Sequence, residues 1–262
     1  MNKFKKLVPA ICMLLVSAVL MGTSTYAWFS MNTSVTANNL GVTAKSNAQY
    51  LLIGTKDNAT DKTATTETGT TVTSTVSDVA LFPVTFIATK TEDTKIGNAS
   101  IPTSITDTTN LWLTANNTNK NKHNDAVTNI KQVTESVNES NAASGAFASY
   151  VKVYAYYLTL DENSVDYSGK LTVTMAEKAA NNTGDLFSGV KAVVKVGTTY
   201  KALASKNDTA EFTGVSITKS TSVKVLVYVY IDGEDSSVTT ANIEAKKAIS
   251  GKLDLSFDIE QK

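Results

Sequence analysis

Side-chain character alternates with a period of two in three stretches of the chain, residues 171–175, 223–231 and 253–259. Successive side chains of a β-strand point to opposite faces, so this alternation predicts strands with one face on a hydrophobic core. In the third stretch one face holds only large hydrophobic residues and the other holds aspartate and serine. The core-facing positions of that stretch are Leu253, Leu255, Phe257 and Ile259.

Other stretches are hydrophobic on both faces. The longest, residues 150–160 (YVKVYAYYLTL), is typical of a strand in the interior of a sheet, and residues 50–54 and 190–196 are shorter examples. Pro83 interrupts residues 79–88 and predicts a sheet edge or a bulge there, because proline cannot donate a backbone hydrogen bond. Turn-forming residues separate the stretches at 161–164, 181–184, 205–208 and 232–235.

Two polar segments, residues 57–77 and 114–147, do not fit a packed sheet and are expected as insertions. Within the second, four hydrophobic residues recur near helical spacing and predict a short amphipathic helix. Another short helix is expected at residues 239–248. The four residues of the first helix are Val127, Ile130, Val133 and Val137.

These patterns together predict an all-β protein. We expect a single antiparallel β-sandwich of the jelly-roll type with about eight to ten strands, polar loop insertions and at most one or two short helices.

The first 27 residues have the three parts of a signal peptide. Residues 2–6 carry three lysines, residues 7–21 are almost entirely hydrophobic, and Thr25 and Ala27 supply small side chains at positions −3 and −1. The sequence therefore predicts a signal helix that is cleaved after Ala27, before Trp28. The expected domains are the signal peptide, 1–27, and an extracellular β-sandwich, 28–262. An uncleaved membrane anchor is the alternative, because the adjoining aromatic residues lengthen the hydrophobic segment.

Composition agrees with export and limits the partners. The chain has 24 basic and 24 acidic residues, all the basic ones are lysines, and the part after residue 27 has a net charge of −3. Such a charge argues against a nucleic-acid partner. The only cysteine, Cys12, lies in the leader, so the secreted part has no disulfide. Contact with a membrane is expected only through an uncleaved leader.

The sequence contains no recognisable catalytic constellation. Its single histidine, His123, lies in a polar segment, and without cysteine or a second histidine the secreted part cannot form a Cys/His zinc site. We therefore expect a protein that is not an enzyme, with no catalytic residue and no cofactor.

Two acidic clusters lie at predicted turns. Carboxylates occur at turns for conformational reasons, but they also suit calcium binding or, in pairs, sugar hydrolysis. The ordinary turn is the primary interpretation, and the calcium candidates are Asp232, Glu234 and Asp235. The other cluster consists of Asp161, Glu162 and Asp166.

Tyrosines are concentrated on two predicted strands. Tyr150, Tyr154, Tyr156 and Tyr157 lie on one of them, and residues 228 and 230 are tyrosines on the other. Packing in the core explains such residues most simply. An exposed aromatic sheet face would instead suit a carbohydrate- or host-surface-binding module.

The leader boundary, residues 25–30 (TYAWFS), resembles signal peptides of Gram-positive bacteria that a dedicated, endospore-former-type signal peptidase cleaves. Residues 23–37 are similar to the N-termini of secreted proteins related to biofilm-matrix fibre proteins and camelysin-like surface proteins. Residues 227–235 (VYVYIDGED) are similar to a strand and acidic turn of the same set. No other part of the chain carries the resemblance.

The resemblance implies a jelly-roll-like sandwich, secretion by a Gram-positive bacterium, and a structural role at the cell surface or in a biofilm matrix. Camelysin-like proteins have been described as proteolytic, but the metal-ligand motif that would support this activity is missing here. The implied partners are the signal peptidase and, through self-association, other copies or other matrix proteins. The alternative function is the carbohydrate- or host-surface-binding module.

Cleavage after Ala27 predicts a mechanism of assembly. It would expose an uncharged, strand-forming segment whose hydrophobic residues include Trp28, Phe29, Met31 and Val35. This segment could add as a strand to the edge of another subunit's sheet and generate filaments. Alternatively, residues 28–40 form the first strand of their own domain.

Overall fold

The computed structural model describes residues 35–37, 42–45, 51–54, 81–117, 127–161, 164–180, 189–205, 207–239 and 251–260. For residues 35–37, 42–45, 117, 176–180 and 251–254 it describes the backbone alone. The chain divides into two compact units, Met1–Thr33 and Ser34–Lys262, and all described residues belong to the second. The leader, the polar segment 57–77, His123 and the helix expected at 239–248, except Thr239, lie outside the described residues.

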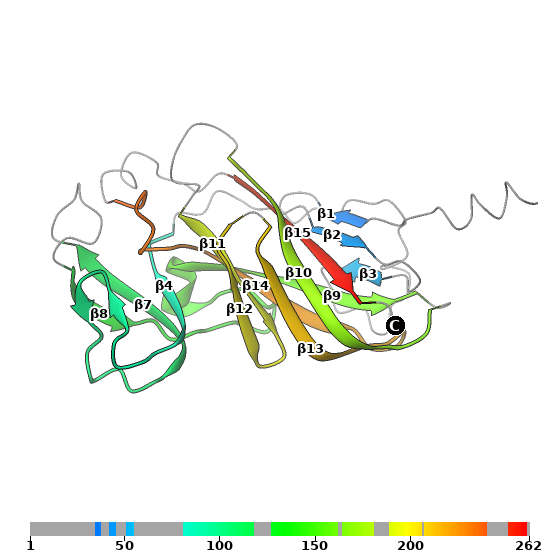
Figure 1. The fold of residues 1–262 in the computed structure, drawn as a ribbon, viewed down its shortest axis with the longest axis horizontal. Coiled ribbons are helices and arrows are strands. Elements are labelled where there is room, and N and C mark those ends of the chain that lie inside the picture. Colours follow the sequence, from blue (N-terminus) through cyan, green and yellow to red (C-terminus); the bar gives the residue numbers. More distant parts are fainter. Residues whose placement is uncertain are drawn as a thin grey trace, which may run out of the picture. The chain divides into compact units, whose positions relative to one another are not determined.

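Two five-stranded sheets form a sandwich (Figure 1). Sheet A has the order β1 (Val35–Ala37), β2 (Val42–Lys45), β15 (Gly251–Ile259), β10 (Tyr167–Ala180) and β13 (Thr209–Ile217). Sheet B has the order β12 (Thr199–Leu203), β11 (Val190–Val196), β14 (Val223–Ile231), β9 (Val151–Leu160) and β3 (Leu51–Gly54).

The connections confirm the jelly-roll-like arrangement. From β9 onward the chain passes to the opposite sheet at every connection except the β11–β12 hairpin, which turns at Gly197 and Thr198. Gly197 has a φ of 58°, a conformation that a two-residue hairpin loop requires and that glycine adopts readily. Among the described strand pairs only β2 and β15 run parallel.

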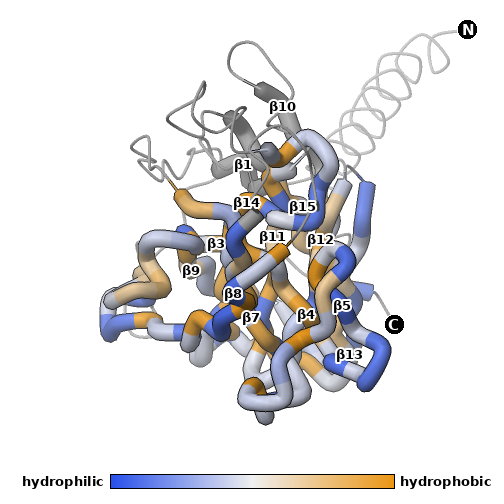
Figure 2. Tube along the Cα trace, turned by 90° about the vertical axis from the view of Figure 1, so that its left-hand side faces the viewer, coloured by the Kyte–Doolittle hydropathy of each residue, from blue (hydrophilic) through white to orange (hydrophobic). Residues whose placement is uncertain are grey.

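The main core lies between sheets A and B, and it confirms the period-two interpretation. Alternate residues from 223 to 229 of β14 and from 255 to 259 of β15 face this core, as do residues 171, 173 and 175 of β10. Figure 2 shows the resulting mixture of hydrophobic and hydrophilic residues along the strands. The core-facing residues of these three strands include Leu171, Val173, Met175, Val225, Val227, Val229, Leu255, Phe257 and Ile259.

A third layer covers the other face of sheet B. It consists of sheet C, with the order β4 (Thr85–Thr89), β7 (Thr109–Asn117) and β8 (Val127–Gln132), together with the hairpin of β5 (Lys95–Ile96) and β6 (Ala99–Ser100). A 3-10 helix, η1 (Gly145–Ser149), follows. Trp112 of β7 packs here against Tyr228 and Tyr230 of β14. Sheet B is therefore buried on both faces, which explains why its strands are hydrophobic on both faces.

The helix predicted at residues 127–137 is wrong. Residues 127–132 form the strand β8, whose register with β7 contains one extra residue beside Asn129. Because of this bulge, Val127 and Ile130 pack in the same hydrophobic cluster although they are three residues apart. Val133 and Val137 pack in the cluster on the opposite side of sheet C. The described residues of this segment, 114–117 and 127–147, accordingly belong to a packed layer and not to a polar loop.

Pro83 lies where its sequence context predicts. It lies two residues before β4, which is an edge strand of sheet C among the described strands. The next residue, Val84, donates its backbone N–H to the carbonyl oxygen of Ile231 and thereby connects the third layer to the end of β14.

Candidate functional site

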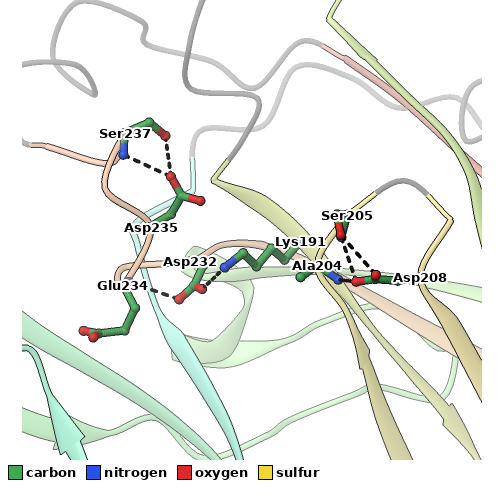
Figure 3. Close-up of polar contacts among 8 residues, drawn as sticks. All are labelled: Lys191, Ala204, Ser205, Asp208, Asp232, Glu234, Asp235 and Ser237. Atoms are coloured by element: carbon green, nitrogen blue, oxygen red, sulfur yellow. Dashed lines mark hydrogen bonds and ion pairs between the residues drawn. The ribbon is translucent and has the colours of Figure 1, made fainter.

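The acidic turn that follows β14 begins with a buried carboxylate. Asp232 is 7% exposed, and its Oδ2 lies 2.5 Å from Nζ of Lys191 on the neighbouring strand β11. Its Oδ1 accepts the backbone N–H of Glu234 at 3.1 Å. Asp232 thus stabilises its own turn and forms an ion pair with an adjacent strand (Figure 3).

The other two calcium candidates point to different partners. Both carboxylate oxygens of Glu234 accept the backbone N–H of Gly97 at 3.1 Å, and Oδ1 of Asp235 accepts the N–H and the hydroxyl of Ser237. Figure 3 shows the Glu234 side chain directed away from Asp232. Within the described residues no three His, Cys, Asp or Glu side chains form a group that could hold a metal ion. These contacts support the ordinary-turn interpretation.

Residues of the second acidic cluster, between β9 and β10, also contact backbone N–H groups. Oδ1 of Asp166 lies 3.4 Å from the backbone nitrogen of Lys219, and the carbonyl oxygen of Asp161 accepts the N–H of Ser164. Glu162 lies outside the described residues. A third acidic residue, Asp208, accepts two backbone N–H groups in the turn after β12, and these hydrogen bonds hold its pKa below the ordinary value.

The densest polar arrangement that the structure describes was not predicted from the sequence. Glu135, from the segment after β8, accepts hydrogen bonds from Nζ of Lys195 at 3.0 Å and from the hydroxyls of Tyr200 and Tyr228, each at 2.7 Å. Nζ of Lys195 also lies 4.6 Å from the centre of the Tyr200 ring. We refer to these four residues as the Glu135 cluster.

Burial governs the protonation of the cluster. Burial, followed by the hydrogen bond to Glu135, raises the pKa of Tyr228, and burial is also the main cause of the raised pKa of Tyr200. For Lys195 burial lowers the pKa, but hydrogen bonds with Tyr200 and Glu135 outweigh it and the net shift is upward. Both phenols therefore stay protonated and donate two of the three hydrogen bonds that the Glu135 carboxylate accepts. This arrangement joins the third layer to sheet B.

No signal in the sequence identified Glu135. It lies in a polar segment, and its three partners are 60, 65 and 93 residues away along the chain. The alternation on β14 did show that Tyr228 shares a strand face with Leu226 and Tyr230, but it did not show that another layer covers this face.

The tyrosines of sheet B do not form an exposed aromatic surface. Tyr156, Tyr228 and Tyr230 are at most 3% exposed, and the only large hydrophobic residues with high exposure in the described part of the chain are Phe82 and Val165. The core-packing interpretation is therefore confirmed for these tyrosines. Tyr150 and Tyr154, which the carbohydrate-binding alternative also included, are half-buried.

Among the residues predicted for cleavage and assembly, only Val35 is described. It begins β1, where it pairs with Ala44 of β2 at the edge of sheet A. Thr25, Ala27, Trp28, Phe29 and Met31 lie outside the described residues.

Comparisons with protein families, curated proteins and solved structures find no match to this chain. Among the described residues, no helix has the length and hydrophobicity needed to cross a membrane.

Proposed function

We propose that this protein is an exported structural protein of the bacterial cell surface or extracellular matrix. The observation that carries the proposal is the position of β1. This strand begins eight residues after the predicted cut at Ala27 and is the outermost described strand of sheet A. Cleavage of the leader would consequently leave residues 28–34 as the segment that precedes an edge strand in the sequence.

Edge strands support association, because their outer backbone groups can pair with another chain. β1 is only three residues long and contacts β2 alone among the described strands. In our proposal, residues 28–37 exchange this pairing for the edge of another subunit, with the hydrophobic side chains of Trp28, Phe29 and Met31 fixing the register. Repetition of this contact builds a filament, since a head-to-tail contact need not close.

The first experiment concerns export. The full chain is produced in a Gram-positive host, and the N-terminus of the protein in the medium and on the cell surface is determined by mass spectrometry. We expect the chain to begin at Trp28. An intact leader on a cell-bound protein would instead indicate the anchored alternative.

The second experiment concerns assembly. Purified protein beginning at Trp28 is compared by electron microscopy with protein beginning at Val35, and both are checked by circular dichroism for the same β-sheet signal. We expect filaments from the first protein and single particles from the second. Equal assembly, or no assembly by either protein, would contradict strand donation.

A further inference from the structure

Lys191 and Asp232 bring an amine and a carboxyl group into direct contact between two strands. The Nζ···Oδ2 distance is 2.5 Å, shorter than the 2.7–2.9 Å that is typical of a charge-assisted N–H···O hydrogen bond. The side chains are 21% and 10% exposed. They come from adjacent strands, because Lys191 pairs with Tyr230, two residues before Asp232.

The third layer covers the carboxylate. Val84 forms a bridge with Asp232, its N–H donates to Ile231, and its carbonyl oxygen accepts the N–H of Gly233. A side chain at position 233 would lie 3.4 Å from Thr85. These contacts leave the Asp232 side chain only 10% exposed.

We propose that Lys191 and Asp232 become joined by an intramolecular amide bond between Nζ and Cγ. A proton first passes from the Lys191 ammonium group to Oδ2 across the short contact and gives an amine and a carboxylic acid. The lone pair of Nζ then attacks Cγ, and the electrons of the C=O bond move to Oδ1. The backbone N–H of Glu234, which already donates to Oδ1, stabilises the resulting negative charge.

Collapse of this intermediate completes the reaction. Oδ2 takes a second proton from Nζ and leaves as water when the Cγ–Oδ2 bond breaks. The products are one amide and one water molecule, and no oxidant or other reactant is needed. The new bond closes a loop between residues that are 41 positions apart, in a chain with no cysteine beyond Cys12. It would constrain the unfolded chain as a disulfide does.

The test is the intact mass of the purified protein, compared with the mass calculated for the same N-terminus. We expect a mass lower by one water molecule. Trypsin should then fail to cleave after Lys191 and should release residues 179–195 joined to residues 225–246. Lys195, which contacts Glu135 at 3.0 Å, serves as the matched control and should be cleaved normally. A full calculated mass with cleavage after Lys191 would overturn the proposal.

The variant Lys191→Arg provides a second measurement, because it keeps the positive charge but removes the amine. We expect the full calculated mass and a Tm lower by about 10 °C, the effect of losing one such loop closure. A variant mass that is still lower by one water would exclude Lys191 as the amine. The joined tryptic peptides of the unchanged protein decide the question even if this variant fails to fold, because cyclisation of Asp232-Gly233 to a succinimide would also lower the mass by one water but would leave the peptides separate.

Discussion

At the scale of single residues, Glu135 accepts hydrogen bonds from three side chains of sheet B. Its side chain is 23% exposed and that of Lys195 is 24% exposed, so water screens their interaction only in part. We expect Glu135→Gln to lower the free energy of unfolding by about 2 kcal/mol, because a neutral amide cannot accept hydrogen bonds from all three donors. Urea denaturation measures this difference.

The matched control is Glu211→Gln on β13. Glu211 forms an ion pair with Lys170 at 3.1 Å, but its side chain is 55% exposed, and exposed pairs contribute little. The free energy of unfolding should stay nearly unchanged. Equal losses in both variants would show that the Glu135 cluster does not connect the third layer to sheet B.

The buried tyrosines predict a loss of stability in alkaline solution. Burial raises the pKa of Tyr154 to about 12, and burial followed by the charge of Asp232 raises the pKa of Tyr230 above its ordinary value of 10.0. The unfolded chain therefore releases protons above pH 10 that the folded chain retains. The stabilisation from these neutral phenols is complete below pH 10 and declines as the pH rises towards 12 and beyond.

For Tyr230 the decline is at most about 1.4 kcal/mol per pH unit. Urea denaturation at several pH values on both sides of 10 gives the slope of the free energy of unfolding against pH. The phenolate absorbance should rise at a higher pH in the folded protein than in the unfolded chain. Tyr230→Phe should reduce the slope. If the folded protein's tyrosines all ionised near pH 10, this account of their burial would be wrong.

Residue contacts were the least predictable part of this protein from its sequence. Turn preferences correctly placed Asp232 and Asp235 in turns, since short polar side chains hydrogen-bond to nearby backbone N–H groups. The same preferences could not identify Lys191 as the partner of Asp232, because that contact depends on the pairing of β11 with β14. Calcium binding was considered because three carboxylates lie within four positions, but each of them faces a different partner.

At the scale of elements, the bulge in β8 determines which side chains face which layer. Asn129 has a φ of 53°, in the left-handed region that asparagine and glycine tolerate, and it is exposed. We expect Asn129→Val to lower the free energy of unfolding by about 1–2 kcal/mol, because a β-branched residue is strained in this conformation. Thermal and urea denaturation measure the change.

Asn129→Gly should differ from the natural chain by no more than about 0.5 kcal/mol, because glycine adopts the same conformation without strain. Thr128→Val tests the general effect of valine at an exposed neighbouring position of β8. The bulge would not be important if valine were tolerated equally at positions 128 and 129.

The strands were largely predictable because hydrophobic side chains in a sheet must alternate or lie between two layers. Residues 150–160 and 190–196 were recognised for this reason, and they form β9 and β11. β8 was not recognised, because its extra residue changes the spacing on one face from two to three, a value typical of a helix. A bulge cannot be distinguished from a helical turn by spacing alone.

At the scale of the whole molecule, sheet B separates two hydrophobic cores, one on each of its faces. Trp112 is 1% exposed and contacts Phe147, Tyr228 and Tyr230, so the third layer cannot separate without exposing sheet B. We expect the second compact unit to unfold in one transition. Tryptophan fluorescence of Trp28→Phe, which leaves Trp112 as the only tryptophan, should change at the same urea concentration as the circular dichroism signal.

An earlier fluorescence transition would show that the third layer opens independently.

The two-layer sandwich was predictable from the alternating strands, but the third layer was not. Most of β4 lies within segment 79–88, and β8 lies with the end of β7 within segment 114–147. The composition of these two segments indicated an edge and a polar insertion. Their packing becomes evident only when the outer face of sheet B is found to be hydrophobic.

The parallel pairing of β2 with β15 has a consequence for the time at which this protein folds. Val42 lies beside Leu255, so sheet A cannot be completed while residues 251–259 are still inside the ribosome. Contacts between such distant parts of a chain also form slowly. An emerging chain thus lacks its completed sheet until residues 251–259 have left the ribosome, and until then it can still be held in an extended form. For a protein that crosses the membrane in an extended form, the order of its strands would itself delay folding until translocation has finished.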